Sequence, residues 1–206
     1  MPYIFNSANE SSTLGLPMMR AMLLEFQDDP AVENLDRQYM FGESLLVAPI
    51  LNEEGDASFY LPKGKWTHLL TNDLVEGGTW LHENHDYLSL PLFARPNSII
   101  AMGSDEYHAD YDYAQNVELH LFQLEDGKSI SVTVRNPKSE VELAVTAARF
   151  GKELVVNVTE TTGKPWSLLV RGIFEISKSD NVKVVTTELG MKLIPEQDAQ
   201  SFTVGL

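Results

Sequence analysis

The sequence offers two kinds of side chain that could do chemistry, paired carboxylates and clustered histidines. Asp28 and Asp29 are adjacent and could act as an acid–base pair. Neighbouring side chains rarely converge on one substrate, however, and both residues suit the cap of a helix that begins at Pro30. A second acidic group comprises Asp105, Glu106, Asp110 and Asp112. This group lacks the spaced ligands and the turn glycine of a calcium loop, which favours a solvated charge run.

Residues 82–86 (His-Glu-Asn-His-Asp) could supply metal ligands, because two histidines three positions apart can converge on one face of a helix. Gly77-Gly78 and the Thr79-Trp80 that follows instead indicate a β-hairpin or a loop. The sequence contains no G-x-S-x-G nucleophile motif and no glycine-rich phosphate loop between a strand and a helix. We therefore expect no metal, no cofactor and no catalytic residue.

Aromatic residues gather in the same region: Tyr60, Trp66, Trp80 and Tyr87. Exposed aromatic rings on a sheet can stack against sugars. Large aromatic side chains more often fill the interior of a β-sandwich, so we expect these four to belong to the core.

The elements that would position these residues change character along the chain. Residues 16–26 form a nearly continuous apolar run, which is typical of a buried strand, with a buried helix as the competing interpretation. A helix is predicted from Pro30, capped by Asp29 and closed by Gly42, because Val32, Leu35 and Tyr39 then share one face. Residues 45–51 predict a further strand.

From about residue 55 the pattern predicts β-structure. Short apolar runs alternate with turn residues, as in a sandwich or barrel. After residue 117 the alternation is regular: Val117, Leu119, Leu121 and Gln123 share one strand face, and Glu118, His120, Phe122 and Leu124 share the other. This last part requires no helix.

Composition limits the class of protein. The 206 residues carry thirty acidic and fifteen basic side chains, a net charge of −15, which argues against a nucleic-acid partner because positive charge supplies most of that affinity. No window approaches the ~20 apolar residues of a membrane-spanning helix, and no signal peptide is visible. Cysteine is absent, which excludes disulfides. We expect a cytoplasmic globular protein without a membrane partner.

Three ordered stretches, residues 15–30, residues 38–49, and residues 59–66 combined with 90–100, resemble the C-terminal part of glycoside hydrolase family 31, the α-glucosidase and α-xylosidase family. The sequences of residues 35–40 and 66–69 are most similar to those of bacterial α-xylosidases. Asn97 stands where many members have glycine, and asparagine tolerates the same left-handed backbone.

The resemblance implies a mainly β fold, in which two consecutive β-sandwich domains follow a short α/β remnant of a (β/α)8 barrel. The predicted segments are 1–52 for the barrel remnant, 53–116 for the proximal sandwich with its acidic connector, and 117–206 for the distal sandwich. Met1-Pro2-Tyr3 is similar to the family's helix before the last barrel strand. The start would then be internal to a longer enzyme, as in an expressed fragment or a truncated reading frame.

The family's retaining mechanism uses two aspartates on barrel loops, and the motifs that carry them would precede everything present here. The resemblance therefore implies no catalytic, cofactor-binding or metal residue in this chain. Arg20, on the last barrel strand, is expected to form an ion pair that stabilises the barrel. The chain would be the non-catalytic part of an α-xylosidase-like enzyme and would be inactive alone.

The implied partners are the missing barrel and, in the full enzyme, an α-xylosyl or α-glucosyl oligosaccharide. Without a barrel, residues 16–26 would expose apolar surface and strand edges. We expect either a homo-oligomer interface there or packing back onto the first β domain. The competing hypotheses are a carbohydrate-binding module and a self-associating structural domain.

Overall fold

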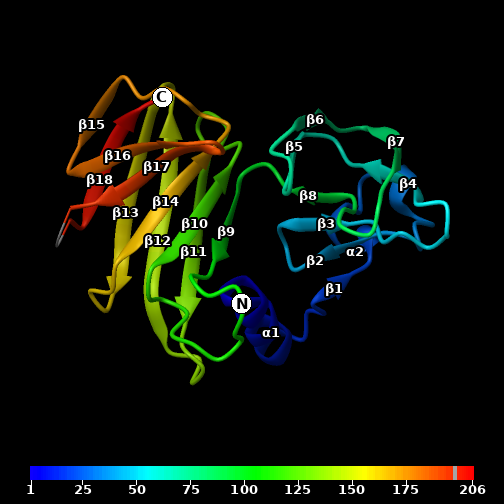
Figure 1. Cartoon of the computed structure of the whole chain (residues 1–206), viewed down its shortest axis with the longest axis horizontal. Coiled ribbons are helices and arrows are strands. Elements are labelled where there is room, and N and C mark those ends of the chain that lie inside the picture. Colours follow the sequence, from blue (N-terminus) through cyan, green and yellow to red (C-terminus); the bar gives the residue numbers. More distant parts are fainter. Residues whose placement is uncertain (197–198) are drawn as a thin grey trace. The chain divides into compact units, whose positions relative to one another are not determined.

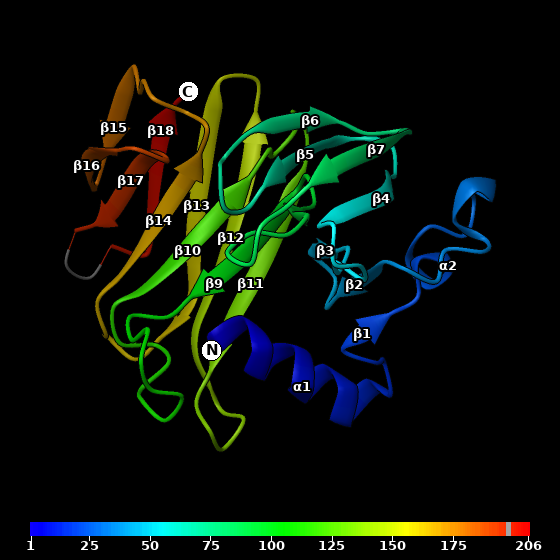
Figure 2. The ribbon, with the colours of Figure 1, turned by 45° about the vertical axis from the view of Figure 1, so that its right-hand side comes forward.

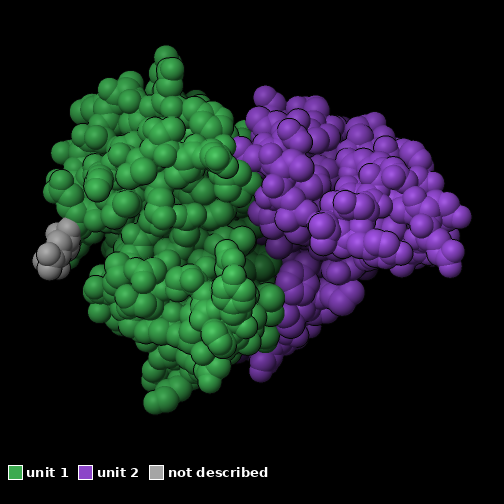
Figure 3. Space-filling model, viewed as in Figure 1, with its two compact units in different colours: residues 1–10, 97–206 green, residues 11–96 purple. Residues whose placement is uncertain are grey.

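The computed structural model describes residues 1–196 and 199–206. It divides into two compact units, unit 1 with Met1–Glu10 and Asn97–Leu206, and unit 2 with Ser11–Pro96 (Figure 3). Within the described ranges, no helix has both the length and the apolar character to cross a bilayer.

Unit 1 consists mainly of two five-stranded sheets (Figure 1). The first has the order β16-β17-β14-β10-β9, with β9 (Ser98–Met102), β10 (Val117–Phe122), β14 (Trp166–Arg171), β16 (Val182–Thr187) and β17 (Gly190–Pro195). The second has the order β11-β12-β13-β18-β15, with β11 (Ser129–Arg135), β12 (Val141–Phe150), β13 (Glu153–Thr161), β15 (Lys178–Asp180) and β18 (Ser201–Gly205). Neighbouring strands are antiparallel except β10 and β14, which run parallel with Val117 opposite Trp166.

The core of unit 1 lies between these two sheets, which can be followed in Figure 2. Leu119 and Leu168 come from the first sheet, Val145 and Val156 come from the second, and all four are buried in one cluster. Each sheet therefore buries one apolar face against the other, which is the arrangement of a β-sandwich. The mainly β fold expected from the sequence is confirmed. The predicted lack of helices after residue 117 is also confirmed for the residues that the structure describes there.

The alternation along β10 holds as far as Phe122 and then fails. Gln123 adopts a left-handed backbone with φ of 42°, which ends the strand. The change of direction turns Leu124 into the core of unit 1, so its predicted place beside Glu118 and His120 is wrong. At Asn97, by contrast, φ is 57°, and the left-handed backbone predicted there is confirmed.

Helix α1 (Pro2–Leu14) begins in unit 1, and its first residues pack on the sandwich. The Phe5 and Tyr113 rings lie 5.5 Å apart, and the Asn6 side chain donates a hydrogen bond to the backbone oxygen of Thr133. Composition and periodicity did not indicate this helix. Only the family resemblance placed one at the start of the chain.

Unit 2 is built on a six-stranded sheet of order β1-β2-β3-β8-β5-β6, which packs with the two-stranded sheet β4-β7. The six strands are β1 (Met19–Arg20), β2 (Tyr39–Phe41), β3 (Leu45–Val47), β5 (Lys65–His68), β6 (Leu74–Glu76) and β8 (Leu92–Ala94). β4 (Asp56–Leu61) and β7 (Thr79–Asn84) form the smaller sheet. Phe59, Trp66 and Phe93 are fully buried between them.

The apolar run at residues 16–26 is not one buried strand. It divides into β1 and the short helix α2 (Met22–Glu25). Met22 is buried in the core of unit 2, whereas Leu23 and Leu24 are exposed. The strand prediction is therefore wrong. Packing back onto the first β domain is confirmed for Met22 and Phe26, which lie in one cluster with Phe59 and Trp66, but it does not include Leu23 and Leu24.

The helix predicted over residues 30–42 is also absent. Pro30–Val32 form a single 3₁₀ turn, and Tyr39 begins strand β2. The buried side chain of Gln38 explains the difference, because its amide bonds both the backbone N–H and the backbone C=O of Tyr60, at 2.7 and 2.8 Å. This distant pairing overrides the helical spacing of Val32, Leu35 and Tyr39.

The six-stranded sheet contains residues from both sides of position 52. β1, β2 and β3 come before it, and β3 pairs with β8, which in turn pairs with β5. The two compact units are divided at other points, after Glu10 and after Pro96. The two units reflect how the chain packs, whereas the boundaries 1–52, 53–116 and 117–206 came from the family resemblance. Those boundaries therefore stay a prediction.

Gly103 allows a close approach inside unit 1. A Cβ atom there would lie 1.6 Å from the Tyr111 hydroxyl oxygen. We expect Gly103→Ala to lower the free energy of unfolding of unit 1 by roughly 1–3 kcal/mol, as overpacking does. Thermal or urea unfolding measures the loss.

Tyr111→Phe provides the matched control, because it removes a buried hydroxyl that has no hydrogen-bond partner among the described residues. The Gly103→Ala cost should shrink in the Tyr111→Phe background. An equal cost in both backgrounds would contradict the contact.

Candidate functional site

Arg20 is the residue for which the family resemblance predicted an ion pair. Its side chain is only 4% exposed. One guanidinium nitrogen lies 2.8 Å from Glu25 Oε1, and the other carboxylate oxygen of Glu25 lies 3.0 Å from a guanidinium nitrogen of Arg95. Arg20 thus forms an ion pair, as predicted. Its effect on a barrel stays a prediction.

Glu25 therefore joins parts of the chain that are far apart in sequence. Arg95 follows β8, and its guanidinium stacks 4.7 Å above the Phe26 ring. Its backbone N–H donates a hydrogen bond to the Ser44 backbone oxygen at 2.8 Å. The three stretches that carry the family resemblance meet here. A carboxylate shared by two arginines is held as a structural counter-ion, so this junction is suited to packing and not to proton transfer.

Asp29, the second residue of the Asp28–Asp29 pair, also has a structural role. Asp29 accepts a hydrogen bond from the Ala31 N–H at 3.1 Å, which confirms the predicted cap. Its second oxygen accepts the Tyr60 hydroxyl at 2.9 Å. Burial and then this bond raise the pKa of Tyr60. Asp29 therefore serves as a cap and as a partner of Tyr60.

Of the four aromatic side chains singled out in the sequence, two are buried and two are exposed. Trp66 is fully buried and its indole N–H donates to the Pro62 backbone oxygen at 2.7 Å, and Tyr60 is also buried, so both belong to the core as predicted. Trp80 is 57% exposed and Tyr87 is fully exposed, so the core prediction is wrong for these two. Trp80 packs 5.8 Å from the Tyr60 ring at the edge of the small sheet.

His82 lies on strand β7 and His85 just beyond it, so this segment is not helical. β7 pairs with β4 and β6 pairs with β5, so Gly77-Gly78 joins two strands that do not pair, and the hairpin alternative is wrong. His82 pairs with the Ser58 hydroxyl at 2.8 Å, whereas His85 pairs with Glu83 at 2.8 Å. The two imidazoles have separate partners. Across residues 1–196 and 199–206, no three His, Asp or Glu side chains are grouped to hold a metal ion.

Unit 1 contains a polar cluster that sequence reasoning missed, on the face of the first sheet that points away from the core. Glu118 accepts hydrogen bonds from His120 Nε2 at 2.9 Å and from Lys192 Nζ at 2.5 Å. A guanidinium nitrogen of Arg171 lies 3.1 Å from His120 Nδ1. Arginine can only donate, so His120 Nδ1 accepts and Nε2 carries the proton. The imidazole therefore connects Arg171 to Glu118.

These contacts shift the charge states of the cluster. The His120 hydrogen bond, with Lys192 adding to it, lowers the pKa of Glu118 to about 2. Burial lowers the pKa of Arg171, and Glu118 opposes that effect. The sequence signal was present as the alternation of Glu118, His120 and Phe122, but nothing in it revealed that Arg171 and Lys192 come from neighbouring strands.

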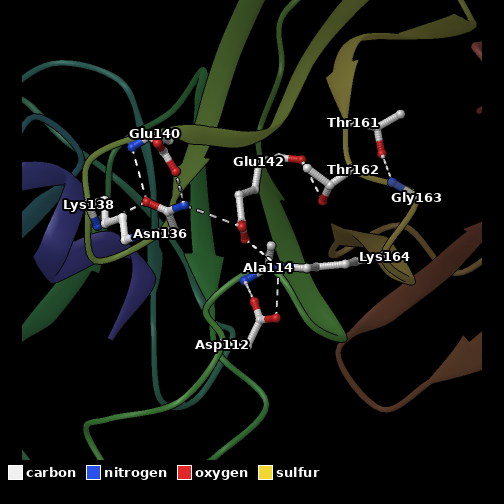
Figure 4. A network of polar contacts seen from close by, with 10 residues as sticks. All are labelled: Asp112, Ala114, Asn136, Lys138, Glu140, Glu142, Thr161, Thr162, Gly163 and Lys164. Atoms are coloured by element: carbon white, nitrogen blue, oxygen red, sulfur yellow. Dashed lines mark hydrogen bonds and ion pairs between the residues drawn. The ribbon is translucent and has the colours of Figure 1, made fainter.

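A second network closes one end of the sandwich (Figure 4). Lys164 lies 2.7 Å from Asp112 and 2.6 Å from Glu142, and Asn136 links Glu142 to Glu140. The bond to Asp112 raises the pKa of Lys164 and lowers that of Asp112. The prediction of a solvated charge run is therefore wrong for Asp112, which is held in an ion pair.

Two models of known protein families match consecutive parts of the chain. Residues 15–100 match the family model described as the glycosyl hydrolase family 31 C-terminal domain, and residues 112–206 match the model of the C-terminal domain of alpha-xylosidase YicI. Two consecutive β domains of this kind define the C-terminal part of a glycoside hydrolase. The chain belongs to glycoside hydrolase family 31.

Individual relatives agree. Alpha-xylosidase XylQ of Lactiplantibacillus pentosus is 40% identical over 167 residues, which cover 79% of this chain and 22% of XylQ. An alpha-xylosidase of Emericella nidulans is 38% identical over 106 residues, which cover 48% of this chain and 14% of that protein. The chain thus spans about a fifth or less of these relatives.

A solved structure shows the same fold. The GH31 dextranase of Flavobacterium johnsoniae, a D412A mutant complexed with isomaltotriose, superimposes with a TM-score of 0.83. The match is 19% identical and covers the whole of this chain and 31% of the dextranase chain. At this identity the likeness concerns the fold alone.

The Glu118 cluster predicts an acid-dependent stability. A carboxylate whose folded pKa is depressed stabilises the fold above its unfolded pKa, and this stabilisation is lost as the pH falls from about 4.5 toward about 2. We expect Glu118→Gln to lower the stability of unit 1 at pH 7 and to flatten its decline over this acidic range. Urea unfolding, followed through the amide signals of β10, measures both effects.

Glu153→Gln, at an exposed strand position, is the matched control and should keep the wild-type acid dependence. If Glu118→Gln loses stability with acid as steeply as the unchanged protein, the cluster does not have this role.

Proposed function

We propose that this chain forms the non-catalytic C-terminal β domains of a retaining α-glycosidase of the α-xylosidase type. The observation that carries the proposal is the order of the two family matches, residues 15–100 and then 112–206, along a chain that is 40% identical to XylQ. The substrate of the whole enzyme would be an α-xylosyl or α-glucosyl oligosaccharide.

The described carboxylate clusters support a non-catalytic role. A retaining glycosidase needs two carboxyl groups ~5–5.5 Å apart, one free to attack and one free to donate a proton. Glu25, Asp29 and Glu118 are instead bound by arginine, by backbone and tyrosine, and by histidine and lysine, respectively. A (β/α)8 barrel, which would carry the reaction, typically takes about 250 residues. We therefore assign no catalytic residue to this chain.

The junction at Glu25 suggests how the chain would stabilise that barrel. Beside it in sequence, Leu14, Met19, Leu23 and Leu24 are exposed apolar side chains of unit 2. Exposed apolar residues of this number favour a covering partner. In the whole enzyme the covering partner would be the barrel, and for this chain alone it would be a second copy.

Light scattering tests the second possibility. The isolated chain should form a dimer or larger oligomer that Leu23→Asp converts to a monomer. Glu33→Lys, a charge change at an exposed position in the same unit, should leave the oligomer intact. A monomeric unchanged protein would rule out the second copy and leave the barrel as the covering partner.

The non-catalytic role is tested in two steps. The pure chain should release no p-nitrophenol from p-nitrophenyl α-xyloside or α-glucoside, and clear turnover would overturn the proposal. A chimera that carries this chain in place of the matching 167 residues of XylQ should keep α-xylosidase activity, whereas XylQ without that region should be inactive or unstable. A well-folded but inactive chimera would also count against the proposal.

A second candidate function is carbohydrate binding by the proximal domain. The observation that favours it is Trp80, whose ring is 57% exposed beside Tyr60. Such a ring could stack on a sugar face. Isothermal titration with isoprimeverose tests it, since saturable binding should be lost in Trp80→Ala.

A further inference from the structure

Unit 1 contains a pocket of about 630 Å³ at one end of the sandwich. It lies where strand β13 ends, where β14 begins and where β17 ends, so both sheets contribute to its walls. Its size falls within the range of small-molecule sites. Neither the Glu25 junction nor the Glu118 cluster belongs to it.

Trp166 supplies the large aromatic surface of this pocket. It is the first residue of β14, it is partly exposed, and its ring centroid lies 6.3 Å from that of the buried Phe202. Phe202 supports the indole from the core side. No described residue accepts a hydrogen bond from the Trp166 indole N–H. The ring therefore offers both an apolar surface and an unused donor.

Polar side chains surround this ring. Glu160, Glu196 and Gln200 line the pocket and are exposed. Within the described ranges, no hydrogen bond or ion pair engages these three side chains. They offer carboxylate acceptors and an amide that can both donate and accept. The pocket thus combines an aromatic surface with free hydrogen-bonding groups.

The charge of the pocket selects among ligands. Lys164, the one lysine in the lining, is already neutralised by Asp112 and Glu142. Glu160 and Glu196 therefore leave the site negative, in a chain whose net charge is −15. An anionic ligand would be repelled. A neutral molecule with an apolar C–H face and many hydroxyl groups matches both the ring and the acceptors.

One wall of the pocket is held in place before any ligand binds. The loop at residues 162–165 is fixed by the Lys164 network of Figure 4 and by a hydrogen bond from the Thr162 N–H to the Glu142 backbone oxygen at 3.0 Å. At the other end of this loop, the Asn116 N–H donates to the Pro165 oxygen at 2.8 Å. Such preorganisation lowers the entropic cost of binding.

We propose that the pocket around Trp166 is a binding site for a neutral pyranose sugar. One face of the sugar ring stacks on the indole, and its hydroxyl groups donate to the carboxylates of Glu160 and Glu196. The site is distinct from the Trp80 surface and does not depend on the chain's role beside a barrel, so each proposal can fail without the other.

Two-dimensional amide NMR of the full 206-residue chain tests the site directly. Methyl α-D-xylopyranoside and methyl α-D-glucopyranoside should produce saturable shifts, with weak affinity, at residues 158–166 and 194–196. Sodium D-glucuronate should bind at least about fivefold more weakly, because its carboxylate meets Glu160 and Glu196. Choline, a cation of similar size, distinguishes a cation site, and tighter binding of choline than of the neutral sugars would overturn the proposal.

Variants identify the residues responsible. Trp166→Ala should weaken the neutral sugars about fivefold or more, and Trp166→Phe should restore part of that loss because it keeps an aromatic face. Glu160→Ala, at an exposed strand position, should weaken binding without affecting thermal stability. It keeps the proposal testable if Trp166→Ala fails to fold.

Trp80→Ala is the matched control and should bind like the unchanged chain. Shifts that follow Trp80 and residues 56–61, and that survive Trp166→Phe and Glu160→Ala unchanged, would overturn the proposal and favour the proximal surface. Failure of both neutral sugars to shift any signal at saturating concentration would also overturn it.

Discussion

The ion pairs of Glu25 are the contact on which the arrangement of unit 2 depends. One carboxylate bonds a guanidinium from the strand at residues 19–20 and another from the link after β8. The Arg20 side chain is nearly fully buried, so its charge requires this partner. The ends of a unit whose strands are mostly three to six residues long are thereby held together. The three stretches that carry the family resemblance meet at this contact.

Electrostatics in the rest of the chain follow the same pattern. In a molecule with a net charge of −15, two further lysines form ion pairs within polar clusters. Lys164 contacts both Asp112 and Glu142, and Lys192 shares Glu118 with His120. Each bridge joins strands or loops that are distant in sequence. These two lysines therefore act as cross-links between distant parts of unit 1.

Much of the fold could be predicted from local signals. The Asp29 cap, the left-handed Asn97 and the alternation of β10 as far as Phe122 each depend on residues close together in sequence, and all three are confirmed. The failures occur where a distant partner decides. The spacing of Val32, Leu35 and Tyr39 fits a helix, but the Gln38 amide bonds the backbone of Tyr60 and keeps the segment extended.

The candidate sites were harder to predict than the fold, for a related reason. Arg20 could be assigned an ion pair because the family resemblance placed it on a strand, yet its partner Glu25 could not be read from spacing. The Trp166 pocket forms only where three strand ends from two sheets meet. In the sequence, Trp166 is one more aromatic residue after a turn. Its neighbours Glu160 and Glu196 are thirty-six positions apart, by subtraction of their numbers.

The parallel pairing of β10 with β14 has a consequence for how the chain assembles. Residues 117–122 lie beside residues 166–171, and the intervening segment forms three strands of the opposite sheet. During synthesis on a ribosome, β10 must wait, without its central neighbour, until those strands have emerged. The hairpins β11–β12 and β12–β13 can form early from local contacts, whereas the first sheet closes late. Nascent chains of this protein would pass through a stage with one half of the sandwich formed and its inner face uncovered.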